Sequence, residues 1–250
     1  MTAATVIAAL CLPADARVEQ RVPKKLLVEN GAPTAADKRQ INEGIEELHW
    51  IAALKPATIG VPVFRDDTRE YLEIAVLSVM LRAGAKAPRL AELIHRAIPY
   101  PLLLILSEPL GISLSLCHLR WSQGHAGQMV LDGSPSRALL ESTHPSCAPF
   151  LSALDVTSQP RGDLHAFYDG WLRCFDAYAA AQVTSTFTLC ETSIAGDARR
   201  SALADHDRLT REIAALRAQA GRETQLNRRV ELNLQLHRLE ASRAAADRLL

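Results

Sequence analysis

The segment Tyr71–Arg82 constrains the fold of this chain more than any other. It reads YLEIAVLSVMLR, and both faces of the extended segment are mostly apolar, which is typical of a strand in the centre of a sheet. A continuous apolar run, YPLLLILSE at 100–108, predicts a second buried strand. After a turn at 109–111, the alternating segment ISLSLCHLRW predicts a half-buried strand antiparallel to it.

Helical periodicity surrounds these strands. Apolar residues at three- and four-residue spacing predict helices over 35–54, capped by Thr34, and over 87–97. An aromatic-rich helix is predicted over 163–181, and ATIGVPVF at 57–64 predicts an edge strand because it contains a proline. The order of elements favours an α+β domain with one mixed or antiparallel sheet and packed helices.

The remaining segments give weaker predictions. A short helix is expected over 3–11, an extended chain after Pro23, and a long irregular excursion over about 122–162 with one short helix at 135–140. Loops of that length within a compact domain are uncommon and usually have a function or lie against another surface.

The C-terminal tail differs from the rest of the chain. Residues 196–250 contain no aromatic residue, and their apolar positions form two heptad phases that change near Gly221. We therefore expect an α+β domain over 1–195 and a helical hairpin or coiled coil over 196–250, with helices at about 202–220 and 222–249. Self-association through these helices is compatible with the pattern.

Composition narrows the class of protein. The chain has 250 residues, 28 Lys and Arg against 28 Asp and Glu, and 48% hydrophobic residues, which is typical of a globular protein and gives no general argument for binding nucleic acid or membranes. Its odd number of cysteines, five, argues against a disulfide framework. No basic segment precedes the first apolar stretch, so we expect no signal peptide, no membrane association and a cytoplasmic location.

No catalytic motif stands out. Glycine-rich phosphate loops and the G-x-S-x-G elbow are absent from the sequence. Several Cys and His side chains occur near the irregular excursion, but their spacings match no standard zinc site, so we expect no metal and no other cofactor. These candidates are Cys117, His118, His125, His144 and Cys147.

A metal-dependent nuclease is the enzymatic alternative. Asp66, Asp67 and Glu73 lie around a predicted pair of strands in the order in which nuclease cores place acidic residues to hold Mg²⁺, and Glu47 lies on the preceding predicted helix. The nuclease would use Glu47, Asp67 and Glu73. However, Ile74 and Ala75 follow Glu73, so the lysine of an active Glu-x-Lys motif is missing. The pattern is compatible with a degenerate core or with a charged turn, and it leaves enzymatic activity open.

Basic residues form a second candidate site. Lys24 and Lys25 follow Pro23, and Lys38 and Arg39 lie at the start of the next predicted helix. Such a group fits an acidic partner or the phosphates of DNA, and equally a solvated rim.

Several segments together resemble one bacterial family. They are RVPKKLLVEN, DKRQINEGIEELHWIAALKPATIGVP, YLEIAVLSVMLR, LIHRAIPYPLLLILS, LSLCHLRW and, in the tail, LNRRVELNLQLHRLE. In this order they are similar to domain-of-unknown-function family 4391. The resemblance implies genes that lie beside a helicase and a DNA methyltransferase, in restriction-modification or antiphage-defence clusters. It supplies no catalytic residues, and the segment 122–162 departs from the family pattern.

The sequence therefore favours a protein that recognises a partner over one that catalyses a reaction. We expect a non-catalytic accessory or adaptor subunit that binds a helicase or a DNA methyltransferase. Leu232, Leu236 and Leu239 are the candidate partner-binding residues, because a short hairpin only partly buries such a seam. The alternatives are the nuclease and a purely structural coiled-coil protein.

Overall fold

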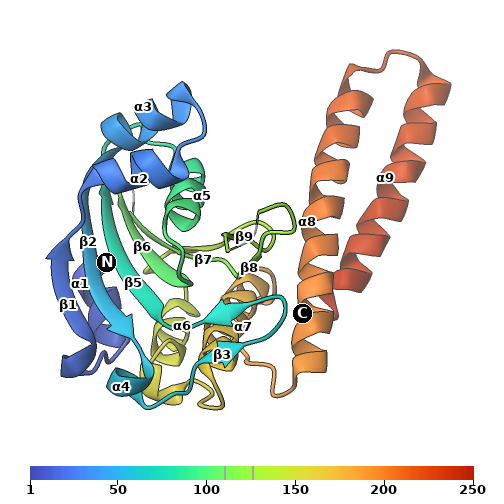
Figure 1. Ribbon diagram of the computed structural model, residues 1–250. Helices are drawn as coiled ribbons and strands as arrows, with labels where there is room; N and C mark the ends of the chain where they lie inside the picture. Colours follow the sequence, from blue (N-terminus) through green and yellow to red (C-terminus); the bar gives the residue numbers. More distant parts are fainter. Residues whose placement is uncertain (110, 126) are drawn as a thin grey trace. The chain divides into compact units, whose positions relative to one another are not determined.

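Figure 1 shows the computed structural model of the chain, which describes residues 1–109, 111–125 and 127–250. The chain divides into two compact units, Met1–Phe175 and Asp176–Leu250. The first unit contains a mixed sheet with packed helices, and the second contains two long helices that pack together. The predicted α+β class is confirmed.

A six-stranded sheet forms the centre of the Met1–Phe175 unit. Its strand order is β1–β2–β5–β6–β7–β10, with β5 and β6 parallel and the other neighbours antiparallel. The strands are β1 Arg17–Arg21, β2 Ile45–Leu54, β5 Ile74–Leu81, β6 Leu102–Glu108, β7 Gly111–Leu116 and β10 Ser136–Leu140. The segment expected to be central, β5, has two strands on one side and three on the other.

Helices cover both faces of this sheet (Figure 1). On one face α2 (Lys24–Gly31), α3 (Ala35–Gly44) and α5 (Ala87–Ala97) share a core with alternate residues of β5 and β6. On the other face lie α1 (Ala3–Ala9), α6 (Cys147–Ala153) and α7 (Leu164–Thr184). The hydroxyl of Tyr168 on α7 donates to the carbonyl of Leu102 on β6, at 2.8 Å. The sheet is therefore enclosed on both sides.

Short elements complete this unit. Two-residue strands β3 and β4 pair with each other, and so do β8 and β9. These elements are η1 Ala14–Ala16, α4 Pro56–Ile59, β3 Phe64–Arg65, β4 Glu70–Tyr71, β8 Leu119–Trp121, β9 Met129–Leu131 and η2 Val156–Ser158. The segment 122–162 thus contains β9, β10, α6 and η2, and it is more regular than its composition indicates.

The single helix predicted over 35–54 is wrong. Thr34 caps α3 as expected, with its Oγ1 accepting from the amide of Asp37 at 3.1 Å, but the helix ends at Gly44 and the chain continues as β2. The pairing of β2 with β5 contains two register shifts. Because each bulge breaks strict alternation, the buried residues Ile45, Leu48 and Ala52 acquire a spacing that resembles helical periodicity.

Two predictions near prolines are also wrong. The extended chain expected after Pro23 is α2, for which the fixed φ of Pro23 prepares the first turn. The edge strand expected at 57–64 begins inside α4, whose first residue is Pro56 and whose first turn is closed by Lys55 and Thr58.

The short helix predicted at 135–140 is likewise wrong. Ser136–Leu140 is the edge strand β10, paired in continuous antiparallel register with β7. The segment is too short for an alternation of apolar and polar residues to identify a strand. Its extended conformation depends on pairing with β7.

The Asp176–Leu250 unit contains a helical hairpin, the first of the two tail arrangements considered. Its helices are α8, Ser193–Arg222, and α9, Leu226–Asp247. Arg217 pairs with Glu240 at 2.6 Å, and His206 with Asp247 at 2.5 Å, which fixes an antiparallel register. Leu209 and Ile213 of α8 and Leu232 of α9 are buried between the helices.

The boundary between the two compact units, after Phe175, falls within α7. Asp176 on the last turns of α7 pairs with Arg200 on α8 at 3.1 Å. Arg199 donates from Nη1 to the carbonyl of Thr188 at 2.5 Å. These contacts attach the end of α7 and the following loop to the hairpin.

All five cysteines are free thiols, and Cys117, Cys147 and Cys174 are buried. In the residues that the structure describes, no helix combines the length and the apolar character needed to cross a membrane.

The buried imidazole of His95 predicts acid sensitivity. His95 on α5 is 1% exposed, its Nε2 lies 3.0 Å from Oγ of Ser115, and burial lowers its pKa to about 3. Because the unfolded state protonates near pH 6.5, the free energy of unfolding should fall as the pH drops from about 6.5 toward 3, by about 2 kcal/mol at pH 5. Urea unfolding at pH 7 and pH 5 measures this loss.

The variant His95→Gln keeps a group able to bond Ser115 and should flatten that pH dependence. The matched substitution His125→Gln, at an exposed position, should leave it unchanged. Equal pH slopes for the wild type and His95→Gln would contradict the assignment.

Candidate functional site

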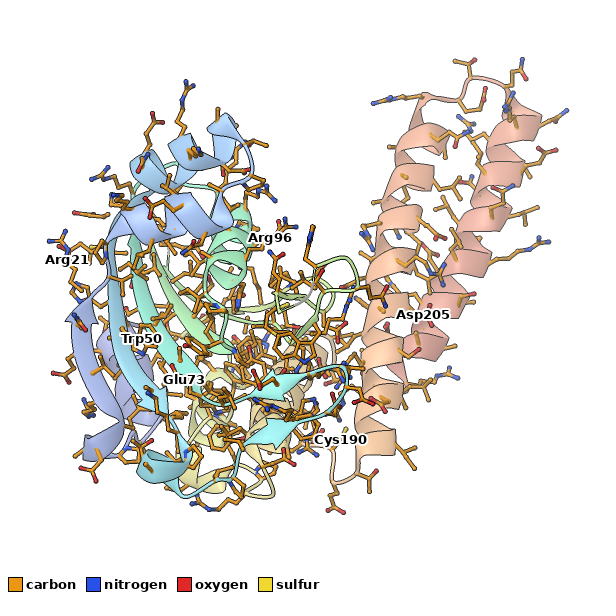
Figure 2. The ribbon with its side chains drawn as sticks, in the orientation of Figure 1. Arg21, Trp50, Glu73, Arg96, Cys190 and Asp205 are labelled. Carbon is orange, nitrogen blue, oxygen red and sulfur yellow. The ribbon has the colours of Figure 1, made fainter. Side chains whose placement is uncertain are left out.

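The three carboxylates of the nuclease alternative lie in different surroundings. Glu47 on β2 is 3.8 Å from Arg21 and 3.6 Å from His49. Glu73, labelled in Figure 2, pairs with Lys55 at 2.8 Å, and Asp67 is exposed in the turn between β3 and β4. Over residues 1–109, 111–125 and 127–250, no group of three or more His, Cys, Asp or Glu side chains is placed to hold a metal ion.

The cysteine and histidine candidates do not converge on such a group either. Cys117 is buried, its thiol donates to the carbonyl of His118 at 3.4 Å, and burial raises its pKa to about 11. A thiol held in its protonated form is a poor metal ligand. Cys147 is buried at the start of α6, where burial also raises its pKa.

The basic candidates divide into one structural residue and three exposed ones. Nζ of Lys24 donates to the carbonyls of Ile45 at 2.5 Å and Asn42 at 3.3 Å, so it joins α2 to the α3–β2 connection. Lys25, Lys38 and Arg39 are exposed on α2 and α3. Lys25 and Arg39 have ion-pair partners one helical turn away, Glu29 and Glu43. Binding of an acidic partner or DNA by these residues stays a prediction.

The leucines predicted to bind a partner contribute to the hairpin itself. Leu232 is 6% exposed, whereas Leu236 and Leu239 are half-buried. Leu239 lines a shallow, mostly apolar groove of about 450 Å³ on the hairpin, together with Ala215 and Leu216 of α8. Partner binding through the three leucines stays a prediction, and Leu232 is inaccessible while the hairpin is closed.

A different set of apolar side chains faces outward from α9. Leu226, Val230 and Leu234 are 65%, 50% and 56% exposed. They recur every fourth residue, so they lie in one row on the side of α9 opposite Leu232. We call this row the outer stripe. The heptad pattern did not identify these residues, because it follows the seam with α8.

Four side chains in the Met1–Phe175 unit form a polar and aromatic cluster that the sequence analysis missed. We call Tyr71, His118, His165 and Asp169 the Tyr71 cluster. The hydroxyl of Tyr71 lies 2.5 Å from Nδ1 of His118, and the rings of His118 and His165 stack with centroids 5.1 Å apart. Oδ1 of Asp169 is 3.9 Å from Nε2 of His118.

The electrostatics of the Tyr71 cluster favour the neutral forms of Tyr71 and His165. Burial raises the pKa of Tyr71, so the phenol remains protonated and can donate to Nδ1 of His118. Burial, followed by the nearby His118 and Arg69, lowers the pKa of His165. Tyr71 and His118 form a hydrogen-bonded pair beside His165 and Asp169. No local sequence pattern indicates this cluster, because β4, the segment after β7, and α7 are far apart in the chain.

Comparison with known proteins identifies one match. Residues 10–242 match the model of a family described as a domain of unknown function, DUF4391. No curated protein and no solved structure matches the chain.

The hydrogen bond between Tyr71 and His118 gives a testable contribution to stability. Tyr71→Phe removes one hydroxyl from a buried site and should lower the free energy of unfolding by about 1–3 kcal/mol, because Nδ1 of His118 loses its partner. Tyr100→Phe is the matched control, since the Tyr100 hydroxyl has no hydrogen bond within the described residues. Urea unfolding curves at pH 7 compare the two, and equal midpoints would contradict the bond.

Proposed function

We propose that this chain, which belongs to the DUF4391 family, is a non-catalytic accessory subunit that binds a partner protein through the α8–α9 hairpin. The partner that the family resemblance implies is a helicase or a DNA methyltransferase of a restriction-modification or antiphage-defence system. In this proposal the protein acts in the cytoplasm.

The observation that carries the proposal is the outer stripe. Helix α9 already buries one apolar row against α8, and it presents a second row, Leu226, Val230 and Leu234, on the opposite side. A hairpin that contacts no other protein requires only one apolar row on each helix, the row that packs against the other helix. Apolar residues aligned over successive turns are the pattern by which a helix contacts another helix.

Burial of the outer stripe alone contributes too little free energy to hold a partner. Each of its side chains is about half exposed, so burying the remainder contributes on the order of 1 kcal/mol per residue. Three such contributions do not offset the cost of association, which is estimated at several kcal/mol or more. The partner must therefore add charge contacts around the stripe.

The charges of the tail specify the chemistry of that partner. Residues 196–250 contain 11 Arg against four Asp and four Glu, and Arg229 and Arg238 lie on α9 next to the outer stripe. An amphipathic helix with an apolar row and acidic flanks fits this surface.

The test is co-expression of the full chain with the candidate helicase and with the candidate methyltransferase, followed by purification on a tag and measurement of affinity. The wild type should retain one of them. Leu234→Glu should weaken binding at least tenfold, because it places a carboxylate in the apolar contact. Gln235→Glu introduces the same charge one residue along, turned away from the stripe, and should stay within twofold of the wild type.

Three outcomes would contradict the proposal. They are capture of neither protein, equal binding by the wild type and Leu234→Glu, and a hairpin that is already saturated as a self-dimer. Light scattering on the purified chain detects the last of these, which would instead support the structural coiled-coil alternative.

A further inference from the structure

A polar cleft of about 840 Å³ opens in the Met1–Phe175 unit, between the α2–α5 side and the segment from β8 to β10. No residue of the hairpin lines it. Its volume lies within the range of small-molecule binding sites. Figure 2 labels Arg96, which lies on α5 at this cleft.

Behind two residues that line the cleft, His95 and Arg137, the sheet is polar where a sheet covered by a helix is normally apolar. On β7, Ser113 and Ser115 face the α5 side, and both are fully buried. Oγ of Ser115 is 3.0 Å from Nε2 of His95, and Oγ of Ser113 donates to Oε1 of Glu108 at 2.5 Å. These buried hydroxyl groups would be costly without hydrogen bonds, and both of them bond to residues at or next to the cleft.

Three guanidinium groups from three different elements line the cleft. They are Arg96 on α5, Arg120 on β8 and Arg137 on β10. Each is held by one carboxylate: Arg96 by Glu92 at 2.7 Å, Arg120 by Asp132 at 3.6 Å, and Arg137 by Glu108 at 2.8 Å.

These ion pairs position the guanidinium groups without occupying all of their donors. A guanidinium has five N–H groups, and one carboxylate accepts at most two of them in the usual geometry. Arg137 uses Nη2 for Glu108 and Ser113, both at 2.8 Å, while its Nε is buried with no hydrogen-bond partner among the described residues. Of the acidic side chains, Glu29 and Glu92 also line the cleft.

Part of the remaining lining is apolar. Met129, Val130 and Leu131 of β9 contribute to it, together with Pro33 and Pro135. A ligand that fits both parts has an anionic group for the arginines and a flat apolar part for the β9 wall. Because the donors approach from three elements, a tetrahedral phosphate, whose oxygens point in several directions, suits them better than a planar carboxylate.

From this arrangement we propose that the cleft binds a nucleotide, with its phosphate held by Arg96, Arg120 and Arg137 and its base against the β9 wall. The nucleotide can be free or part of a single strand, since both carry the same phosphate and base. This proposal uses no residue of the hairpin. The experiments on nucleotide binding and on partner binding can therefore give opposite results.

The test is isothermal titration calorimetry on the full chain in low salt with three probes. They are adenosine monophosphate, inorganic phosphate and a ten-nucleotide single-stranded DNA. At least one nucleotide probe should bind more tightly than inorganic phosphate. Tighter binding of the mononucleotide identifies a free ligand, and tighter binding of the DNA identifies a strand.

The arginine variants locate the site. Arg96→Gln and Arg120→Gln, both at partly exposed positions, should each weaken nucleotide binding at least tenfold. Arg82→Gln, the same change at an exposed residue of this unit outside the cleft, should leave it within twofold. Absence of nucleotide binding at millimolar concentration, binding no tighter than that of phosphate, or equal binding by the cleft variants would overturn the proposal.

Discussion

The parallel pairing of β5 with β6 is the constraint on which the Met1–Phe175 unit depends. Two parallel neighbours need a crossover, so the chain must leave the end of β5, pass over one face of the sheet and return at the start of β6. Helix α5 makes that crossover and buries Leu90, Leu93 and Ile94 against the sheet. The same path carries Arg96 to the rim of the cleft above β7.

The position of α5 divides one face of the sheet into an apolar half and a polar half. Over β5 and β6 the facing residues are aliphatic, including Leu77 and Leu104. Over β7 they become Ser113 and Ser115, and His95 turns from the helix toward the latter. The change from aliphatic to hydroxyl side chains falls between the neighbouring strands β6 and β7, where Leu104 is paired with Ser115 and Leu106 with Ser113.

The hairpin is stabilised differently and presents a different kind of surface. Its interior is a narrow aliphatic seam, and its ion pairs, such as Arg208 with Glu212 at 3.0 Å, are exposed and contribute little. Because the two helices bury little apolar surface between them, burial of further apolar surface against a partner would add a large fraction to the stability of this unit. The outer stripe on α9 offers that contact, whereas the cleft in the sheet unit offers directed hydrogen bonds.

The sequence predicted those elements whose hydrophobic pattern or composition is characteristic within the element itself. The doubly apolar pattern of β5, the periodicity of α5 and the aromatic-free tail each identified an element correctly. The segment 45–54 was misassigned because its bulges imitate helical spacing, and β10 was missed because its conformation depends on β7. The outer stripe was not predicted, because a heptad pattern identifies the residues that can pack between two helices. It does not indicate which other apolar residues stay exposed.

The Tyr71 cluster and the arginines of the cleft could not be predicted from the sequence, because their residues are far apart in the chain. His118 and Tyr71 are 47 positions apart, and the three arginines of the cleft come from α5, β8 and β10. Only the strand order brings either set together. The carboxylates at Glu47, Asp67 and Glu73, chosen for their order along the chain, have separate surroundings for the same reason.

Native-state hydrogen exchange on the full chain tests the central claim most directly, namely that the parallel β5–β6 pair organises one unit and the hairpin forms another. Amides of β5 and β6 should exchange most slowly, through global unfolding of the sheet unit. Amides of α8 and α9 should open together at a lower free energy while the sheet remains protected. Sheet strands that exchange as fast as the hairpin, or a single opening shared by the whole chain, would contradict the account.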